Sequence, residues 1–238
     1  MSKKKICIVL CLASITVTFV TGCGTGQVRK PFNGKDVSNW AFCGPAEKSK
    51  WVTGIAAVSK QDEKQLVAKP GSGEMINVTP EHGASVDMYS KEKFGDSRIE
   101  IEVMVPKGSN SGIYVMGEYE IQVLDSYGRE KMGAGDMGAI YGASPPPINA
   151  SKEPGRWQKY VIEFKTPKFN QKGEKIANAR FIKVELNGQL LHKDLEMPGP
   201  TPGGVTGKEA PTGPIMFQGN HGPVAYRNIR ISPLNVMK

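Results

Sequence analysis

The sequence predicts an all-β protein built as an antiparallel sandwich of two sheets. Short runs in which apolar and polar residues alternate recur along the chain, and segments rich in glycine and proline separate them. No stretch of about twelve residues shows the 3.6-residue period of an amphipathic helix. About a dozen short strands without helices are typical of a two-sheet sandwich.

The N-terminus predicts a lipoprotein signal peptide over residues 1–22. Three lysines, Lys3 to Lys5, precede an apolar run from Ile6 to Val20, which is shorter than the about 20 residues of a membrane span. The run ends in Val-Thr-Gly-Cys, which resembles a bacterial lipobox and predicts Cys23 as the lipidated first residue of the mature chain. An uncleaved anchor helix is the alternative, and the small residues before Cys23 disfavour it.

In either case the globular part is expected outside the cytoplasm, held at a membrane. No acidic cluster of the kind associated with surface export follows Cys23, so we expect a cell-envelope protein on the periplasmic face of the outer membrane. Residues 23–30 are predicted to be a tether and residues 31–238 a single domain, whose length suits one all-β unit.

Cysteine usage and charge exclude several classes of protein. Cys7 and Cys11 belong to the signal and Cys23 carries lipid, so Cys43 has no partner for a disulfide or a cysteine-type zinc site. The chain has 31 basic and 23 acidic residues, and three of the basic ones lie in the signal. This mild charge, without a basic block, excludes nucleic acid as a partner.

The first part of the domain predicts a meander of short strands. Asn33-Gly34 is a tight-turn signal between aromatic residues, and Trp40 and Trp51 are expected in the core rather than as ligand platforms. Strands are expected at residues 55–58, 65–68, 74–78, 98–103, 157–164, 181–186, 189–192 and 224–231. Asn187-Gly188 predicts a two-residue hairpin turn, and residues 168–179 form a polar insertion.

The stretch from Asn110 to Asp125 is the central element of the predicted fold. Its alternation predicts one long strand, with Glu118, Glu120 and Gln122 on a single face. Such a row is either a solvated face or a wet face that grips a polar ligand. The strand at 98–103 is expected to form a hairpin with it, which would place Glu102 on the face of Glu120; a solvated face with charge pairs is the alternative.

Two loops and one histidine are further candidates. Residues 126–154 are too rich in glycine and proline for regular structure, and we expect them to form a loop over a binding face, with Tyr141 at its rim. A second such loop spans residues 198–214. A lone histidine is usually structural, but the glycines around His221 and its neighbours Gln218 and Asn220 favour a site. No metal-binding pattern or nucleophile elbow occurs.

Several of these motifs together resemble the 3-keto-disaccharide hydrolase domain family, and the match spans nearly all of the mature chain. The segments that carry the resemblance are, in order, residues 32–36 with Trp40, 110–114, 119–125, 138–142, 186–188, 218–222 and 226–231. The resemblance implies a concanavalin A-like jelly roll, the fold of many lectins and glucanases. It also implies action on an oxidised carbohydrate, a glycoside that a separate sugar 3-dehydrogenase has converted to its C3 ketone.

The chemistry of such a substrate suggests roles for the candidates. A C3 ketone acidifies the proton on C2, so a base can form an enolate, the C1 substituent leaves, and water adds to give net hydrolysis. Glu120 is the expected base and His221 the acid or second base, while Asp125 would orient groups. The expected substrate-binding residues are Glu102, Tyr114, Gln122, Tyr141, Gln218 and Arg227, the last two as oxyanion donors. No cofactor motif is evident, and a divalent metal that helps the enolate stays open.

Two other functions remain open at this level. Glu120-x-Gln122-x-x-Asp125 resembles the Glu-x-Asp-x-x-Glu strand of retaining β-glucanases, which need two carboxyl groups about 5 to 5.5 Å apart. Gln122 and the shorter Asp125 depart from that pattern. The other alternative is a non-catalytic, lipid-anchored carbohydrate-binding module in which Tyr114, Tyr141 and nearby tryptophans stack on sugars.

Overall fold

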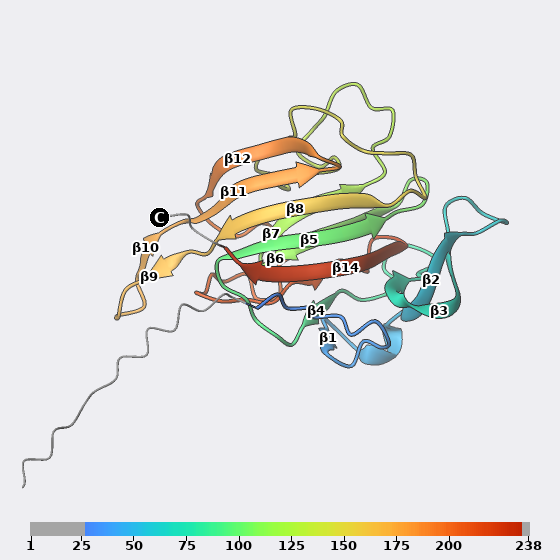
Figure 1. Ribbon diagram of the computed structural model, residues 1–238, viewed down its shortest axis with the longest axis horizontal. Helices are drawn as coiled ribbons and strands as arrows, with labels where there is room; N and C mark the ends of the chain where they lie inside the picture. The colour runs from blue at the N-terminus through green and yellow to red at the C-terminus, as the bar shows by residue number, and fades with distance from the viewer. Residues whose placement is uncertain (1–26, 235–238) are drawn as a thin grey trace, which may run out of the picture.

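The computed structural model describes residues 27–234 as two antiparallel sheets packed face to face (Figure 1). This is the antiparallel jelly-roll sandwich that the sequence predicts. The predicted signal at residues 1–22 and the lipidation site Cys23 lie outside the described residues.

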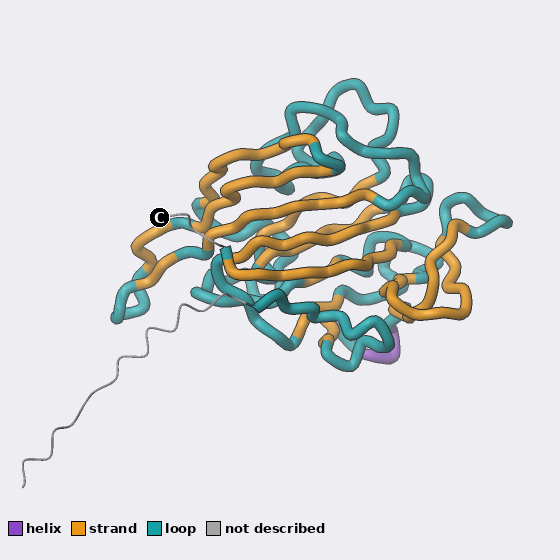
Figure 2. The backbone as a smooth tube through the Cα atoms, in the orientation of Figure 1, coloured by secondary structure: helices purple, strands orange, loops and turns teal. Residues whose placement is uncertain are grey.

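The seven-stranded sheet lies in front in Figure 1 and has the order β12-β11-β8-β5-β14-β3-β2. Its strands are β12 (Gln189–Met197), β11 (Ala179–Leu186), β8 (Gln158–Lys165), β5 (Ser97–Met104), β14 (Val224–Pro233), β3 (Leu66–Asn77) and β2 (Trp51–Val58). The five-stranded sheet behind it comprises β1 (Trp40–Phe42), β4 (Met88–Ser90), β13 (Met216–Phe217), β6 (Asn110–Val115) and β7 (Tyr119–Leu124). A small hairpin of β9 (Lys168–Phe169) and β10 (Lys175–Ala177) and the 3-10 turn η1 (Ala46–Lys48) are the other described elements, and loops make up the rest (Figure 2).

A stack of aromatic rings ties the two sheets together. Phe217 of β13 and Tyr226 of β14 lie parallel, with ring centroids 3.9 Å apart and planes at 8°. Trp40 stacks on Phe217 at 5.2 Å, and Trp51 stacks on Tyr226 at 6.2 Å. Each such ring pair stabilises the folded state by about 0.5–1.5 kcal/mol beyond the contribution of its buried area. The prediction that both tryptophans belong to the core is confirmed.

The predicted single strand from Asn110 to Asp125 is wrong, because the chain reverses at Met116 and Gly117. Both residues have positive φ, 60° and 71°, and β6 and β7 pair across this turn with Tyr114 opposite Glu120. The apolar–polar alternation continues through the turn, so the local pattern did not reveal it. The hairpin places the side chains of Tyr114 and Glu120 side by side, whereas a single strand would separate them by six residues.

The predicted hairpin between residues 98–103 and the central stretch is also wrong. β5 pairs with β8 and β14 in the seven-stranded sheet, whereas β6 belongs to the five-stranded sheet. The segment between them therefore crosses from one sheet to the other. Because of this crossing, Glu102 does not share a face with Glu120.

The C-terminal hairpin follows the prediction. Asn187 and Gly188 both have positive φ, 54° and 82°, which is the backbone geometry that Asn-Gly favours in a two-residue turn. β11 and β12 pair on either side of it, so this hairpin is confirmed.

The start of the described chain is attached to the sandwich. Arg29, within the predicted tether, exchanges two backbone hydrogen bonds with Ile231 of β14, of 2.7 and 2.9 Å. Within residues 27–234, no helix has the length and apolar character of a membrane span.

Candidate active site

A pocket of about 210 Å³ lies on the face of the five-stranded sheet that points away from the core. It is lined by Asn110, Tyr114, Glu120, Gln122, Tyr141, Pro202, Gly203, Gln218 and His221. Strands β6 and β7, the residue after β13, and three loops thus contribute to one site.

The alternation within β7 explains how Glu120 and Gln122 come to face the pocket. Tyr119, Ile121 and Val123 pack into the core between the sheets. Glu120 and Gln122 point the other way, yet only 3% and 4% of their surfaces are exposed. The polar face of this strand is therefore covered by protein, not by solvent.

The loop after β7 forms one wall of the pocket. The loop runs back along β7 and forms backbone hydrogen bonds with it. The N–H of Gly138 donates to the Gln122 carbonyl, and the N–H of Gln122 donates to the Ala139 carbonyl, both at 2.9 Å. The N–H of Tyr141 donates to the Glu120 carbonyl at 3.1 Å. The predicted loop thus lies along the pocket face of β7, and it brings Tyr141, which is 40% exposed, to the rim of the pocket.

The second glycine- and proline-rich loop forms the opposite wall and is fastened by Glu118. The buried carboxylate of Glu118 accepts hydrogen bonds from the backbone N–H and hydroxyl of Thr206, at 2.9 and 2.7 Å, and from Gly207 N–H at 2.9 Å. Thr201 Oγ1 accepts a bond of 2.8 Å from the backbone N–H of Glu120. These bonds hold Pro202 and Gly203 over the site.

Replacing Glu118 by glutamine should loosen this loop. Three donors converge on the carboxylate, and an amide can accept on only one side, so about 2 kcal/mol of stability should be lost. Amide hydrogen exchange at Thr206 and Gly207 should quicken relative to the wild type. Glu130→Gln, at an exposed position whose side chain makes no hydrogen bond within residues 27–234, is the control; equal exchange rates in both variants would contradict the role given to Glu118.

Glu120 and Tyr114 form a buried hydrogen-bonded pair in the pocket. The Tyr114 hydroxyl donates to Glu120 Oε2 at 2.8 Å. Burial raises the pKa of the Glu120 carboxyl to about 7; the Tyr114 hydrogen bond opposes this shift, and the charge of Asp87 adds to it. Burial also raises the pKa of Tyr114, which therefore stays a donor. Glu120 has the pKa of a group that exchanges protons near neutrality.

Gly112 makes room for the Glu120 carboxylate. A Cβ at this position would collide with Glu120 Oε1, and the backbone conformation of Gly112 does not itself require glycine. Gly112→Ala should therefore displace the carboxylate and leave the sheet intact. We expect the kcat/KM of any reaction that depends on Glu120 to fall by about 10²-fold, while the melting curve stays unchanged. Gly199→Ala, where a Cβ meets nothing within 4 Å, should keep full activity; an equal effect of the two changes would refute this reading.

His221 faces the same pocket from the loop after β13. Its Nδ1 is hydrogen-bonded to Asn220 Oδ1. The backbone N–H groups of Gly219 and Asn220 donate to Asp87 Oδ1 at 2.8 and 3.1 Å, which fixes this loop. Burial lowers the pKa of His221, and His82 lowers it further, whereas Asp87 opposes the shift. The lowered pKa favours the neutral form of the His221 imidazole.

Amide side chains line the remaining wall. Gln218 Nε2 lies 3.4 Å from the Tyr114 hydroxyl, and Gln122 Nε2 donates to the Gly135 carbonyl at 3.1 Å. Within residues 27–234, Gln122 Oε1 and Asn110 Oδ1 are buried without a hydrogen-bond partner. Sequence reasoning missed Asn110 as a pocket residue, because Asn-Ser-Gly reads as a turn.

Three of the predicted site residues lie away from this pocket. Asp125 accepts from the backbone N–H groups of Gly108 and Tyr127, at 2.8 and 3.3 Å, and so serves the end of β7. Glu102 and Arg227 pair at 2.8 Å on the seven-stranded sheet.

Arg227 also contacts two other groups there. It bonds Glu74 at 3.0 Å, and its guanidinium lies 4.0 Å from the centre of the Trp157 ring. Tyr226 beside it points into the core, so Arg227 faces outward and cannot serve as an oxyanion donor near Glu120.

The pocket favours some chemistries over others. Glu120 is the single carboxylate among its lining residues, so the two-carboxylate retaining mechanism lacks a second member there. Trp40 and Trp51 are buried in the core and offer no stacking surface. Within the described residues no three His, Cys, Asp or Glu side chains are grouped to hold a metal ion.

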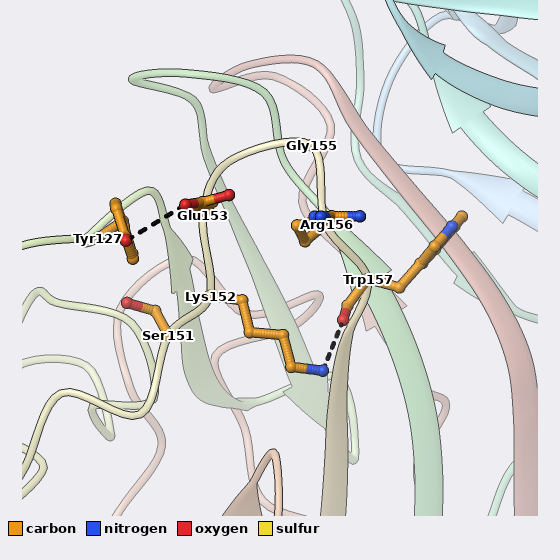
Figure 3. Close-up of a pocket in the computed structure, with 7 residues that line it drawn as sticks. All are labelled: Tyr127, Ser151, Lys152, Glu153, Gly155, Arg156 and Trp157. Atoms are coloured by element: carbon orange, nitrogen blue, oxygen red, sulfur yellow. Dashed lines mark hydrogen bonds between the residues drawn. The ribbon is translucent and has the colours of Figure 1, made fainter.

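A larger cavity, of about 730 Å³, lies beside the two ends of the loop after β7 (Figure 3). Glu153 accepts from the Tyr127 hydroxyl at 3.4 Å, and Lys152 donates to the Trp157 carbonyl at 3.3 Å. Its charged side chains are exposed, and it contains neither a buried carboxylate nor a histidine. The smaller pocket is therefore the better candidate for acid–base chemistry.

The fold and the pocket together define a jelly-roll protein with a small pocket, on the outer face of one sheet, that is lined by one carboxylate and one histidine. Residues 27–232 match the model of the 3-keto-alpha-glucoside-1,2-lyase-like domain, and the chain belongs to this family. Membership supports a carbohydrate-active function.

Solved structures agree with this assignment. A proposed glycosyl hydrolase from Parabacteroides distasonis shares 29% identity at a TM-score of 0.65, over 89% of this chain and 84% of that one. Two further proposed glycosyl hydrolases of the same organism share the fold. One has 16% identity and a TM-score of 0.57 over 87% of this chain and 94% of its own, the other 20% and 0.53 over 87% and 100%. A search of curated proteins gives no match.

Proposed function

We propose that the protein is an enzyme that cleaves the glycosidic bond of 3-keto-glucosides, by elimination across C1 and C2 followed by addition of water. The observation that carries the proposal is that one small pocket is lined by both Glu120, whose burial raises the pKa of its carboxyl to about 7, and His221, whose burial lowers its pKa. Family membership supports the substrate class.

The reaction needs a base, an acid and an oxyanion donor. A base removes the proton from C2, and the C–H electrons move into an enolate whose charge rests on the C3 oxygen. The enolate then restores the C3 ketone, forms a C1–C2 double bond and expels the C1 oxygen, which an acid protonates. Water adds its hydroxyl to C1 and a proton to C2, so the net change is hydrolysis.

The electrostatics of the pocket favour His221 as the base and Glu120 as the acid, the reverse of the first expectation from the sequence. The lowered pKa of His221 leaves its imidazole free to accept a proton, while the raised pKa of Glu120 leaves its carboxyl protonated up to about pH 7. Gln218, which has a second N–H besides the one near Tyr114, would donate to the enolate oxygen.

This assignment predicts a bell-shaped pH dependence. The value of kcat/KM should rise as His221 loses its proton below neutral pH, and fall again as Glu120 ionises near pH 7. Activity should therefore peak in the weakly acidic range. Steady-state rates between pH 4.5 and 9 check this; a profile that instead rises through pH 7 and stays high would identify Glu120 as the base.

The substrate class is tested with three sugars. The soluble domain without residues 1–23 is incubated with 3-keto-trehalose, trehalose and laminarin, and released sugars are followed by mass spectrometry. We expect release of 3-keto-glucose from the oxidised sugar alone. Cleavage of laminarin would favour the retaining glucanase, and saturable binding of sugar without any product would favour a binding module.

The sequence motifs also bear on where the protein lies in the cell and on which reaction supplies its substrate. We propose that Cys23 carries the lipid anchor at the periplasmic face of the outer membrane and that a separate sugar 3-dehydrogenase supplies the ketone. Metabolic labelling with a radioactive fatty acid should mark the full-length protein but not its Cys23→Ala variant; equal labelling of both would refute the anchor.

A further inference from the structure

Two of the three histidines in the chain are in ring contact. The centroids of His82 and His221 lie 4.7 Å apart with the rings at 81°, an edge-to-face arrangement. His221 is half-buried and lines the pocket, whereas His82 is exposed on the segment between β3 and β4. The pair therefore joins the pocket to the surface.

The backbones around the two rings are fixed to each other. Gly83 N–H donates to the Asn220 carbonyl at 2.6 Å. From the same segment, Asp87 accepts the N–H groups of Gly219 and Asn220. One backbone bond between the neighbours of the two rings and two bonds accepted by Asp87 fix the contact as part of the fold.

The contact bears on the protonation of His221. The Asn220 amide oxygen can only accept, so the His221 Nδ1 carries the hydrogen and Nε2 keeps its lone pair. Two imidazoles in contact resist carrying two positive charges at once. The other charged groups near His221 are Asp87, whose Oδ1 is occupied by two N–H groups, and Glu120 across the pocket.

We propose that His82 is a positioning residue for His221: its ring holds the imidazole against the pocket and opposes a positive charge on it. His82 would thereby keep Nε2 of His221 available as a proton acceptor. This inference rests on the proposed role of His221, but its first test does not require turnover.

The test is an NMR titration of the histidine side chains of the soluble domain, in the wild type and in the variants His82→Phe and His82→Lys. Phenylalanine keeps an aromatic ring at the contact and removes the charge, so the titration midpoint of His221 should move to higher pH. Lysine fixes a positive charge there, so the midpoint should move to lower pH. His192, buried against the Gly138 carbonyl, is the internal control and should not move.

Activity provides the second readout. With 3-keto-trehalose as substrate, the acid limb of kcat/KM should follow the NMR midpoint in each variant, to higher pH in His82→Phe and to lower pH in His82→Lys. An unchanged His221 midpoint in both variants overturns the inference. If the wild type turns over none of the sugars, the proposed function fails while the NMR result still decides the role of His82.

Discussion

The Glu120→Gln variant is expected to lose turnover of 3-keto-trehalose by about 10²–10⁴-fold while folding normally. Glutamine has nearly the same shape and can still accept the 2.8 Å bond from the Tyr114 hydroxyl, but it cannot give a proton to a leaving oxygen. Glu102→Gln is the matched control, since Glu102 pairs with Arg227 outside the pocket. Equal activity of the two variants would refute the assignment of Glu120.

The same variant should be more stable than the wild type at alkaline pH. The pKa of Glu120 is raised from 4.5 to about 7 in the folded protein, so the folded state prefers the protonated carboxyl and pays increasingly for ionisation as the pH rises from 4.5 to 7. Glutamine removes this cost, which amounts to at most about 3 kcal/mol above pH 7. Thermal melts should show a gain at pH 8 and none at pH 4; the opposite order would contradict the raised pKa.

Replacing His221 by asparagine should abolish the first proton transfer. If His221 is the base, this variant stops exchanging the C2 hydrogen of 3-keto-trehalose for deuterium in D2O, with a loss of about 10²–10⁴-fold. Glu120→Gln should still exchange that hydrogen, because it lacks only the acid that protonates the leaving oxygen. NMR of the unreacted sugar measures both rates. Exchange that is lost in Glu120→Gln and kept in His221→Asn would reverse the two roles.

The fold class could be predicted because the patterns that mark strands and tight turns lie within short segments of the sequence. Alternation marked most strands, and Asn187-Gly188 marked the hairpin between β11 and β12. The reversal at Met116-Gly117 was missed because a methionine rarely adopts positive φ, and because alternation runs unbroken through the turn. A turn signal was therefore present only in Gly117.

Only part of the candidate site could be predicted, because local patterns mark single segments and not which segments meet in the fold. Glu120, Tyr114 and His221 lie in segments whose own pattern pointed to a site, and the structure brings them together. The grouping of Glu102 with Glu120 failed because the assignment of strands to sheets depends on distant pairings, which alternation along one strand does not encode.

The roles of two other residues could not be predicted from local patterns. Glu118 was predicted only as part of a polar row, yet it holds loop residues nearly ninety positions away, and His82 contacts a distant segment. Their roles follow from the tertiary packing of loops on the outer face of the sheet, where no period links the partners.

The central claim, elimination through an enolate, is tested most directly with 3-keto-trehalose that carries deuterium at C2 of the oxidised ring. If the reaction is an elimination, 3-keto-glucose released in ordinary water has lost this deuterium, and kcat/KM is lower for the labelled sugar than for the unlabelled one. Product kept in buffer without enzyme controls for spontaneous exchange. Released 3-keto-glucose that retains its deuterium, with no isotope effect on the rate, would contradict elimination and indicate direct hydrolysis at C1.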